Sequence, residues 1–374
     1  MNDNQSESIR EFVFTSESVS EGHPDKVCDL IADSILDAHL VGDRNARVAC
    51  EVLCKGRDVV LAGEITSVAT VDAEKIARDV IRGIGYTDSS EEFNANGVRI
   101  RELITQQAGE IGRAVQGASG APQGAGDQGL MFGYATDETP ERMPLPILLA
   151  HRLSAFLARD RRETRVDWLL PDAKTQVSVR YRDGLPVQVE TVLVSTQHSR
   201  AVSRSEIQAF VREDLLPRAL GAWFHKEINA IVNPSGSFLV GGPSADAGVT
   251  GRKIIVDTYG GFARHGGGAF SGKDPSKVDR SGAYFSRWVA RKIVDSGLAR
   301  RAEVQVAYAI GRPEPVSTMI ETFGTGDAVA AKRFVDRQDF SPAGMAAQLN
   351  LLRPIYAKTT NYGHFGRPGL PWES

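Results

Sequence analysis

Apolar and polar positions along the chain follow two different periods, which predict a mixture of helices and strands. Val27, Ile31 and Ile35 recur at helical spacing behind Pro24, so a helix is expected from Pro24 to His39. Similar patterns predict further helices at 71–84, 145–159, 205–216, 280–297 and 342–356. Short or alternating apolar runs predict strands at 12–14, 46–54, 59–66, 175–181, 187–195, 238–240, 254–256 and 304–310. Because strands and helices mix without steady β-α alternation, an α+β fold is favoured over a doubly wound sheet.

Composition narrows the class of protein. A chain of 374 residues predicts two or three domains, and its net charge of −3 gives no overall basic field for nucleic acid or an anionic membrane. No apolar run approaches the roughly 18 residues that span a bilayer, and the first ten residues lack a signal-peptide core. The three cysteines, Cys28, Cys50 and Cys54, lack metal-type spacing. A cytoplasmic protein is expected.

One stretch, residues 260–280, combines six glycines with two lysines, two arginines, a histidine and two aspartates. Glycines let backbone N–H groups approach a ligand, and cationic side chains bind phosphate oxygens, so the stretch predicts a polyphosphate site. Gly267 to Lys273 matches the start of a P-loop, but Asp274 stands where a P-loop needs Ser or Thr, which argues against that class. A mobile glycine-rich loop with solvated charges is the other alternative.

Further candidates for the site are a histidine and an aspartate at a predicted helix start and two glutamates in predicted strands. His23 and Asp25 flank Pro24 at the predicted helix N-terminus, where N–H groups and partial positive charge favour anions. As alternatives, Asp25 complements the helix dipole and His23 caps the helix. Glu51 and Glu64 lie within predicted strands, where solvent-facing positions are the usual explanation. The weakly patterned stretch 106–128 is either an active-site lid or an interdomain linker.

Taken together, five blocks resemble S-adenosylmethionine synthetase (methionine adenosyltransferase) of the bacterial and eukaryotic type. The blocks run from Phe12 to about Trp372 in the family's order: Phe14 to Lys26, Gly124 to Ala135, Pro171 to Lys174, Gly251 to Gly261 and Arg264 to Arg280. The resemblance implies attack of methionine sulfur on C5′ of ATP, loss of the whole triphosphate, and its hydrolysis to phosphate and diphosphate. A catalytically inactive paralogue that binds nucleotide as a regulatory or assembly subunit is the alternative.

The resemblance also implies roles for individual residues. His23, Lys273 and Arg252 are the expected catalytic residues, because they would stabilise charge on the departing triphosphate. The expected ATP-site residues are His23, Asp172, Lys174, Phe238, Asp246, Arg252, Lys253, Ala269 and Lys273. The expected methionine-site residues are Glu64, Gln107, Asp127, Asp246 and Lys277. Asp25 and Asp279 resemble Mg²⁺ ligands, with two ions per active site, and Glu51 resembles the ligand of one K⁺ per subunit.

The implied fold has three similar α+β domains related by pseudo-threefold symmetry, here placed at 12–110, 123–240 and 241–374. A lid at 111–122 would separate the first two domains. The implied assembly is a homo-oligomer, a dimer of dimers with active sites at the dimer interface. This chain departs from the family pattern at Ser237, where an arginine is expected, and at Gly109 and Glu110, which should make the lid more flexible.

Overall fold

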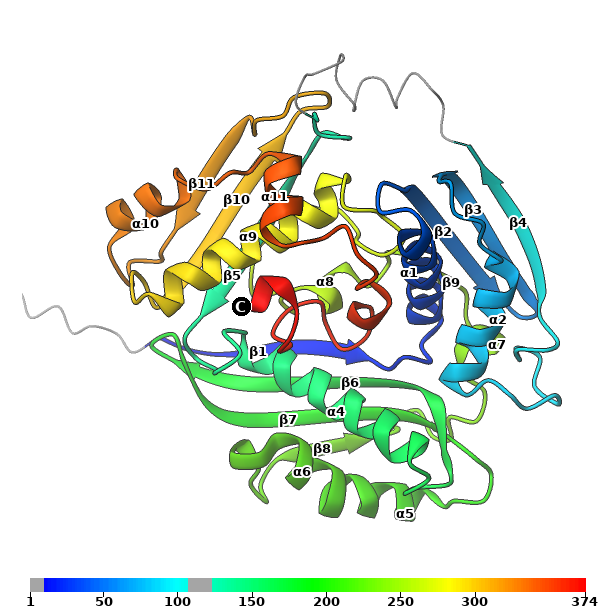
Figure 1. Ribbon diagram of the computed structural model, residues 1–374. Coiled ribbons are helices and arrows are strands. Elements are labelled where there is room, and N and C mark those ends of the chain that lie inside the picture. Colours follow the sequence, from blue (N-terminus) through cyan, green and yellow to red (C-terminus); the bar gives the residue numbers. More distant parts are fainter. Residues whose placement is uncertain (1–9, 107–122) are drawn as a thin grey trace, which may run out of the picture.

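Three β-sheets organise the computed structural model, which describes residues 10–106 and 123–374 (Figure 1). The first sheet has the order β1–β6–β7–β8, the second β11–β10–β5 and the third β4–β3–β2–β9. The strands are β1 Glu11–Val19, β2 Arg47–Lys55, β3 Asp58–Thr66, β4 Arg99–Thr105, β5 Gly129–Thr136, β6 Leu169–Arg182, β7 Leu185–His198, β8 Asn229–Val232, β9 Gly248–Val249, β10 Arg301–Tyr308 and β11 Ser317–Glu321.

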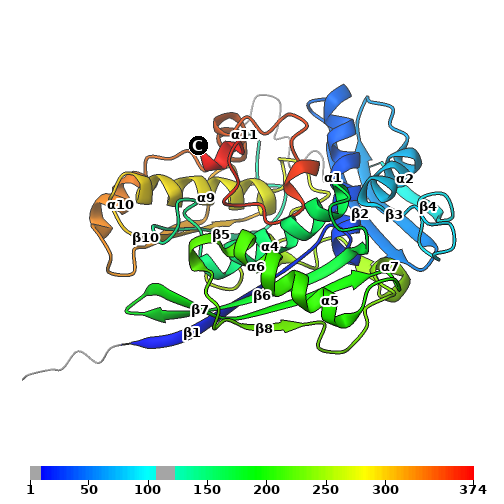
Figure 2. The same cartoon turned by 90° about the horizontal axis from the view of Figure 1, so that it is seen from below.

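Each sheet packs against one long helix. Helix α1 (Pro24–Gly42) covers β2, α4 (Leu145–Arg162) covers β6 and β1, and α9 (Val278–Asp295) covers β5 and β10 (Figures 1 and 2). This arrangement confirms the predicted α+β class and gives three sheet-and-helix units around a common centre. The shorter helices are α2 Ala73–Ile84, α5 Arg204–Ala209, α6 Leu216–Leu220, α7 Gly242–Ala245, α8 Ile254–Asp257, α10 Ala328–Val335 and α11 Pro342–Gln348. A π-helical turn, Phe210–Leu215, joins α5 to α6. None of the helices in the described part of the chain has the length and apolar character to cross a bilayer.

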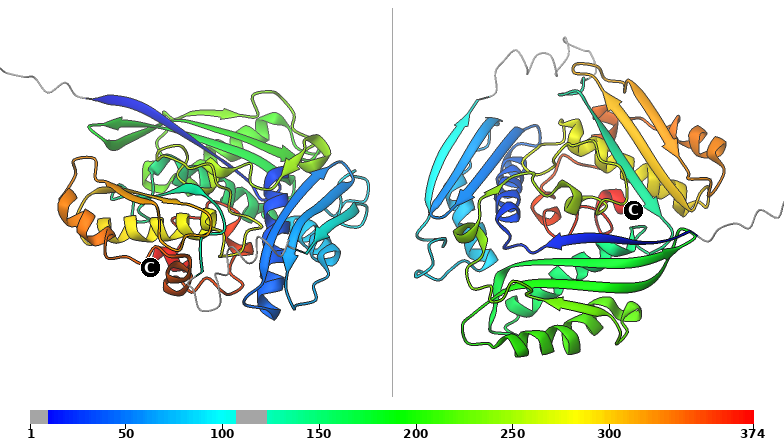
Figure 3. Two further views of the ribbon diagram at one scale, coloured as in Figure 1. Left: turned by 90° about the horizontal axis from the view of Figure 1, so that it is seen from above. Right: turned by 180° about the vertical axis from the view of Figure 1, so that it is seen from behind.

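The three units exchange strands in a cyclic order. Strand β1 from the N-terminal part pairs with β6, and β5 pairs with β10 near the C-terminus. Strand β9 returns to pair with β2, which closes the cycle. Figure 3 shows β1 lying along the β6–β7 sheet when the molecule is seen from behind. The boundaries 12–110, 123–240 and 241–374 stay a prediction, and the exchanged strands mean that these ranges interlock in space.

Several expected elements differ in the structure. Residues 254–256 lie in the short helix α8 instead of a strand, and residues 238–240 form no strand. Runs of three apolar residues carry no periodicity, so they fit either element equally well. The block from Pro171 to Lys174 lies inside β6 instead of preceding the hairpin. The last predicted helix stops at Gln348, because Asn350 adopts a left-handed φ of 47°.

The inward face of α9 is more polar than predicted. Tyr284 and Ile293 are buried as expected, but Trp288 is only half-buried, whereas Arg280 and Arg287 are fully buried. Arg287 donates to both carboxylate oxygens of Glu373, at 3.0 and 2.8 Å, and also to backbone carbonyls of residues 134, 141 and 142. This arginine therefore fastens the C-terminal residues to helix α9 and the segment that follows β5.

Replacing Arg287 by Met should lower the free energy of unfolding by about 3–5 kcal/mol, because the buried Glu373 carboxylate loses its bidentate partner. Urea denaturation followed by circular dichroism measures this change. The matched control is Arg300→Met, which removes an exposed pair with Asp137 and should cost about 1 kcal/mol or less. Equal losses for the two variants would contradict the role assigned to Arg287.

Candidate active site

His23 lies at the N-terminus of α1 as a neutral hydrogen-bond donor. Its ring is 4 % exposed, and its Nδ1 accepts from the Asp25 N–H at 3.2 Å, so the proton of the neutral ring lies on Nε2. Burial, followed by the charge of Lys253, lowers the pKa of His23 to about 3. Nδ1 therefore caps the helix, as one of the two alternatives predicted, whereas donation from Nε2–H to a bound anion stays a prediction.

Because of this low pKa, the ligand-free His23 ring should stay neutral between pH 5 and 8. The unfolded chain takes up a proton near pH 6.5, so the stability that His23 contributes above this pH is lost as the pH falls toward 3. Titration of ¹³C-labelled histidine rings by NMR measures the protonation directly. A midpoint near 6.5 for His23, identified by its absence in His23→Asn, would contradict the assignment.

Asp25 joins the helix to the segment that carries Arg252 and Lys253. Its Oδ1 accepts from the Val249 N–H at 2.9 Å, and its Oδ2 accepts from Lys253 Nζ at 2.5 Å. The Arg252 guanidinium lies 3.8 Å from Oδ1 and is 57 % exposed. Burial opposes ionisation of Asp25, but the hydrogen bonds from Lys253 and Val249 outweigh it, so its pKa is lowered. Asp25 is therefore an ionised carboxylate next to His23.

Close backbone packing fixes this segment against the helix start. A Cβ on Gly248 would lie 2.1 Å from the Pro24 carbonyl oxygen, so only glycine allows the approach. Gly251, with φ of +75°, faces Ala269, which a Cβ at position 251 would meet at 2.5 Å. The predicted residues Arg252, Lys253 and Ala269 consequently gather around the start of α1.

The glycine-rich stretch supplies a second group of charges at the start of α9. Lys273 Nζ donates to Asp279 Oδ2 at 2.5 Å, and Asp279 lies in the first turn of α9. A Cβ on Gly268 would come within 2.4 Å of Asp279 Oδ1, so the loop wraps closely around this carboxylate. Lys277 donates to the buried Asp274 at 2.5 Å. Asp274, the residue that excludes a P-loop, holds Lys277 and also accepts from the Val48 N–H at 2.7 Å.

The predicted strand acids lie next to Lys273. Ala49 in β2 is the register partner of Glu64 in β3 and forms an isolated bridge with Lys273. Glu51 follows two residues later in β2, close enough to Lys273 for the lysine charge to act on its carboxyl group. Both glutamates are exposed in the single chain, as strand acids commonly are. Glu51 and Glu64 are thus exposed to solvent in the single chain and also lie near Lys273.

Asp172 lies in β6, next to the segment that leads into His23. A Cβ on Gly22 would meet the Pro171 backbone at 2.4 Å, so the residues that precede His23 and Asp172 are in contact. Asp172 Oδ2 accepts from the Gly242 N–H at 2.8 Å, whereas its buried Oδ1 has no partner among the described residues. Burial raises the pKa of Asp172 to about 6. An orphaned buried oxygen is the feature that a bound donor would satisfy.

Lys174 and Phe238 complete this part of the site. Lys174 is exposed in β6 and is close enough to lower the pKa of His23. The Phe238 N–H donates to His198 Nε2 at 3.1 Å, and the His198 N–H donates to the Phe238 carbonyl at 3.0 Å. A cavity of about 260 Å³ adjoins Asp172 and Phe238, since Pro171, Gln197, Leu239 and Gly241 line it.

The remaining predicted residues are less tightly placed. Asp127 and Asp246 are exposed, and each accepts from the N–H of the residue that follows it. Asp127 lies two residues before Gly129, where a Cβ would be 3.7 Å from Asp279 Oδ1, and Asp246 influences the pKa of Asp172. Gln107 and the expected lid, 111–122, lie outside the described residues, as do Gly109 and Glu110.

The carboxylates suit Mg²⁺ of the kind that substrate phosphates help to bind. Within residues 10–106 and 123–374, no group of three or more His, Cys, Asp or Glu side chains forms a metal cluster. Asp25 and Asp279 instead sit singly beside Lys253 and Lys273. Mg²⁺ is commonly held by one or two carboxylates together with phosphate oxygens and water, so the donor set fits a metal that arrives with ATP.

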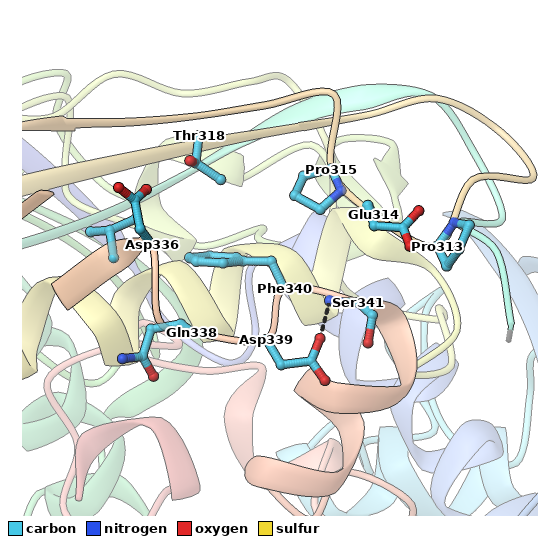
Figure 4. A pocket seen from close by; sticks show the side chains of 10 residues that line it. Pro313, Glu314, Pro315, Thr318, Asp336, Gln338, Asp339, Phe340 and Ser341 are labelled. Carbon is cyan, nitrogen blue, oxygen red and sulfur yellow. Dashed lines mark hydrogen bonds between the residues drawn. The ribbon is translucent and has the colours of Figure 1, made fainter. Parts of the chain in front are cut away.

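A larger cavity lies away from these residues. It measures about 440 Å³ and lies between the β10–β11 turn and the segment that joins α10 to α11 (Figure 4). Its lining includes Glu314, Asp336, Asp339 and Phe340, and it contains none of the predicted site residues.

Two buried carboxylates on α1, Asp29 and Asp33, were not among the residues predicted from the sequence. Asp29 and Asp33 are fully buried and accept from the Gly251 and Gly272 N–H groups, both at 2.9 Å. A signal was present, because aspartates recur at every fourth position from Asp25 to Asp37 and so share one helix face.

Comparisons with known proteins identify the family of this chain. Three family models match in order: the N-terminal domain of S-adenosylmethionine synthetase at residues 11–109, its central domain at 122–238 and its C-terminal domain at 240–374. An S-adenosylmethionine synthase from Akkermansia muciniphila is 54 % identical over 375 residues, which cover 96 % of this chain and 94 % of that protein. One from Sorangium cellulosum is 53 % identical and covers 98 % and 88 %. With three matched models in the order of its three units, this chain belongs to the S-adenosylmethionine synthetase family.

Proposed function

We propose that this chain, as an S-adenosylmethionine synthase, joins ATP and L-methionine by displacement at C5′ of ATP and then hydrolyses the released tripolyphosphate. One observation carries the mechanistic part of the proposal: a neutral His23 and four cations of the C-terminal part gather near the starts of α1 and α9. Helix N-termini and cationic side chains suit a leaving group of three phosphates.

The nucleophile needs little chemical activation. Methionine sulfur is uncharged and carries no proton, so no strong base is required. The barrier is lowered instead by alignment of sulfur, C5′ and the leaving oxygen. Glu64 and Asp127 are the carboxylates that we assign to the ammonium group of methionine, and Gln107 and Asp246 belong to the same predicted subsite. We assign Lys277 to the substrate carboxylate in the same predicted subsite.

Stabilising the charge on the departing triphosphate requires more of the protein than activating the nucleophile. We assign His23 Nε2–H to the oxygen next to C5′, and Arg252, Lys253 and Lys273 to the polyphosphate. Asp172, Lys174, Phe238 and Ala269 would hold the nucleoside, with the orphaned Asp172 Oδ1 accepting a ligand hydrogen bond. Preorganised donors that face developing charge typically make the largest contribution to catalysis.

Metal ions complete the proposed charge balance. Asp25 and Asp279 would hold two Mg²⁺ ions per active site, and Glu51 would hold one K⁺ per subunit. When bound, these ions supply neutralisation of polyphosphate charge. The family generally uses both ions, and the single carboxylates near Lys253 and Lys273 fit this use.

We also propose the dimer of dimers, with active sites at the dimer interface. Large apolar side chains are exposed on the β4–β3–β2–β9 sheet of the single chain, including Leu53 in β2 and Leu103 in β4. Leu53 shares the exposed face of β2 with Glu51, which places the potassium-binding candidate on the same surface. Exposed apolar faces of this kind typically mark protein interfaces. The cytoplasm stays the predicted location.

Product analysis tests the proposed function. The purified chain is incubated with ATP, methionine, Mg²⁺ and K⁺, and the sulfonium nucleoside is measured by mass spectrometry. We expect S-adenosylmethionine in equal amount to phosphate and diphosphate. Tight ATP binding without any sulfonium product would instead favour the alternative of an inactive nucleotide-binding paralogue.

A further inference from the structure

One face of α1 carries an aspartate on each of four successive turns: Asp25, Asp29, Asp33 and Asp37. Each of these carboxylates accepts a backbone N–H from the C-terminal part of the chain. The donors are Val249, Gly251, Gly272, and Tyr356 together with Ala357. The helix therefore binds four separate points of a segment that is more than 200 residues away in sequence.

The second carboxylate, Asp29, holds the backbone next to Arg252 and Lys253, which form the first cationic arm of the site. Its Oδ1 accepts from the Gly251 N–H at 2.9 Å, and Gly251 immediately precedes Arg252 and Lys253. Its Oδ2 accepts from Lys26 Nζ at 3.0 Å, and the fully buried Lys26 also donates to Asp257. Asp29 is fully buried, so no solvent competes for these hydrogen bonds.

The third carboxylate, Asp33, holds both ends of the stretch from Lys273 to Asp279, which forms the second cationic arm. Its Oδ1 accepts from the Gly272 N–H at 2.9 Å, and Gly272 immediately precedes Lys273. Arg280, which immediately follows Asp279, donates to both oxygens of Asp33 at 2.6 and 2.7 Å. One buried carboxylate thus fixes the backbone on either side of the Lys273–Asp279 pair.

We propose that Asp29 and Asp33 are positioning residues for the reaction, which hold the Arg252–Lys253 arm and the Lys273–Asp279 arm at a fixed distance from His23. Neither carboxylate reaches substrate in this arrangement, because each is buried behind the residues it holds. The inference rests on the proposed function of those arms. Rigid support of this kind matters because a small misplacement of a catalytic group costs a large factor in rate.

The fourth carboxylate, Asp37, provides the matched control. It accepts from the Tyr356 N–H at 2.9 Å and from the Ala357 N–H at 2.8 Å, on the same helix face. The segment that it holds carries none of the residues assigned to the site. Asp37→Asn therefore disturbs the same kind of bond but removes no carboxylate that holds a cationic arm. Tyr356 meets Arg280, the partner of Asp33, through its ring, which this substitution leaves unchanged.

The experiment compares Asp33→Asn and Asp37→Asn in the full-length enzyme, at a temperature where circular dichroism shows both to be folded. Measured quantities are kcat, KM for ATP and for methionine, and the rate at which added tripolyphosphate is hydrolysed. For Asp33→Asn we expect kcat and the hydrolysis rate to fall on the order of 10²-fold, with KM for methionine within about threefold of wild type. Asp37→Asn should keep both rates and lose only thermal stability.

Equal effects of the two variants on kcat, or an unchanged kcat for Asp33→Asn, would overturn the proposal. If Asp33→Asn does not fold, Asp33→Asn/Arg280→Gln replaces it, because a neutral pair leaves no uncompensated buried charge. The same two outcomes then apply to the double variant. If the wild-type enzyme formed no sulfonium product, the proposed function itself would be refuted. This result differs from equal kcat values for the two variants, which would refute only the positioning role.

Discussion

His23→Ala should lower kcat for S-adenosylmethionine formation by on the order of 10²-fold or more, while KM for methionine changes little. The Nε2–H of the neutral ring is the donor that we assign to the oxygen leaving C5′, where charge appears only in the transition state. Loss of one such donor typically costs this much in kcat. Initial-rate measurements with saturating substrates test the expectation.

His39→Ala is the matched control, because His39 is a buried histidine near the other end of the same helix. It should reduce stability and leave kcat within about twofold of wild type. Turnover of His23→Ala near the wild-type rate would refute the assigned role. A loss confined to KM for ATP would show that His23 binds the ground state and the transition state equally.

Lys273→Met should reduce kcat on the order of 10²-fold while KM for ATP changes by only a few-fold. In the structure Lys273 Nζ contacts Asp279, and the isolated bridge to Ala49 fixes its backbone beside Glu64. If the charge acts mainly on the departing triphosphate, its removal weakens transition-state binding more than ATP binding. Steady-state kinetics with varied ATP separate the two effects.

Two further variants sharpen this prediction. Lys273→Arg keeps the charge and should recover part of kcat, although a guanidinium does not reproduce the ammonium geometry. Lys332→Met removes an exposed lysine paired with Asp336 on α10 and should have no kinetic effect. An unchanged kcat with a raised KM for ATP in Lys273→Met would contradict a role in the chemical step.

The local parts of the site could be predicted from sequence. Pro24 and the apolar spacing behind it indicated where α1 begins, and the structure puts His23 and Asp25 at that helix start. Asp274 in place of Ser or Thr excluded a P-loop, and in the structure this residue holds Lys277 and the Val48 N–H. Helix starts and turn residues act over a few positions, so a single sequence reveals them.

The long-range parts could not be predicted in the same way. Strand exchange among β1, β5 and β9 depends on pairing between residues far apart in the chain, and no local period records it. The two-residue strand β9 and the helix α8 are too short to show any periodicity. Arginine is rarely fully buried unless it is paired. Arg280 and Arg287 are buried because Asp33 and Glu373 pair with them, and the sequence does not reveal these distant partners.

The proposed displacement breaks the bond between C5′ and oxygen in ATP, so the fate of that oxygen can be followed with an isotope. ATP labelled with ¹⁸O at the bridge between C5′ and the α-phosphorus is turned over with methionine, Mg²⁺ and K⁺. Displacement at carbon predicts that all of the label appears in the phosphate and diphosphate products, with none in a nucleoside. Label retained in adenosine, AMP or ADP would mean that phosphorus is attacked, and it would contradict the mechanism.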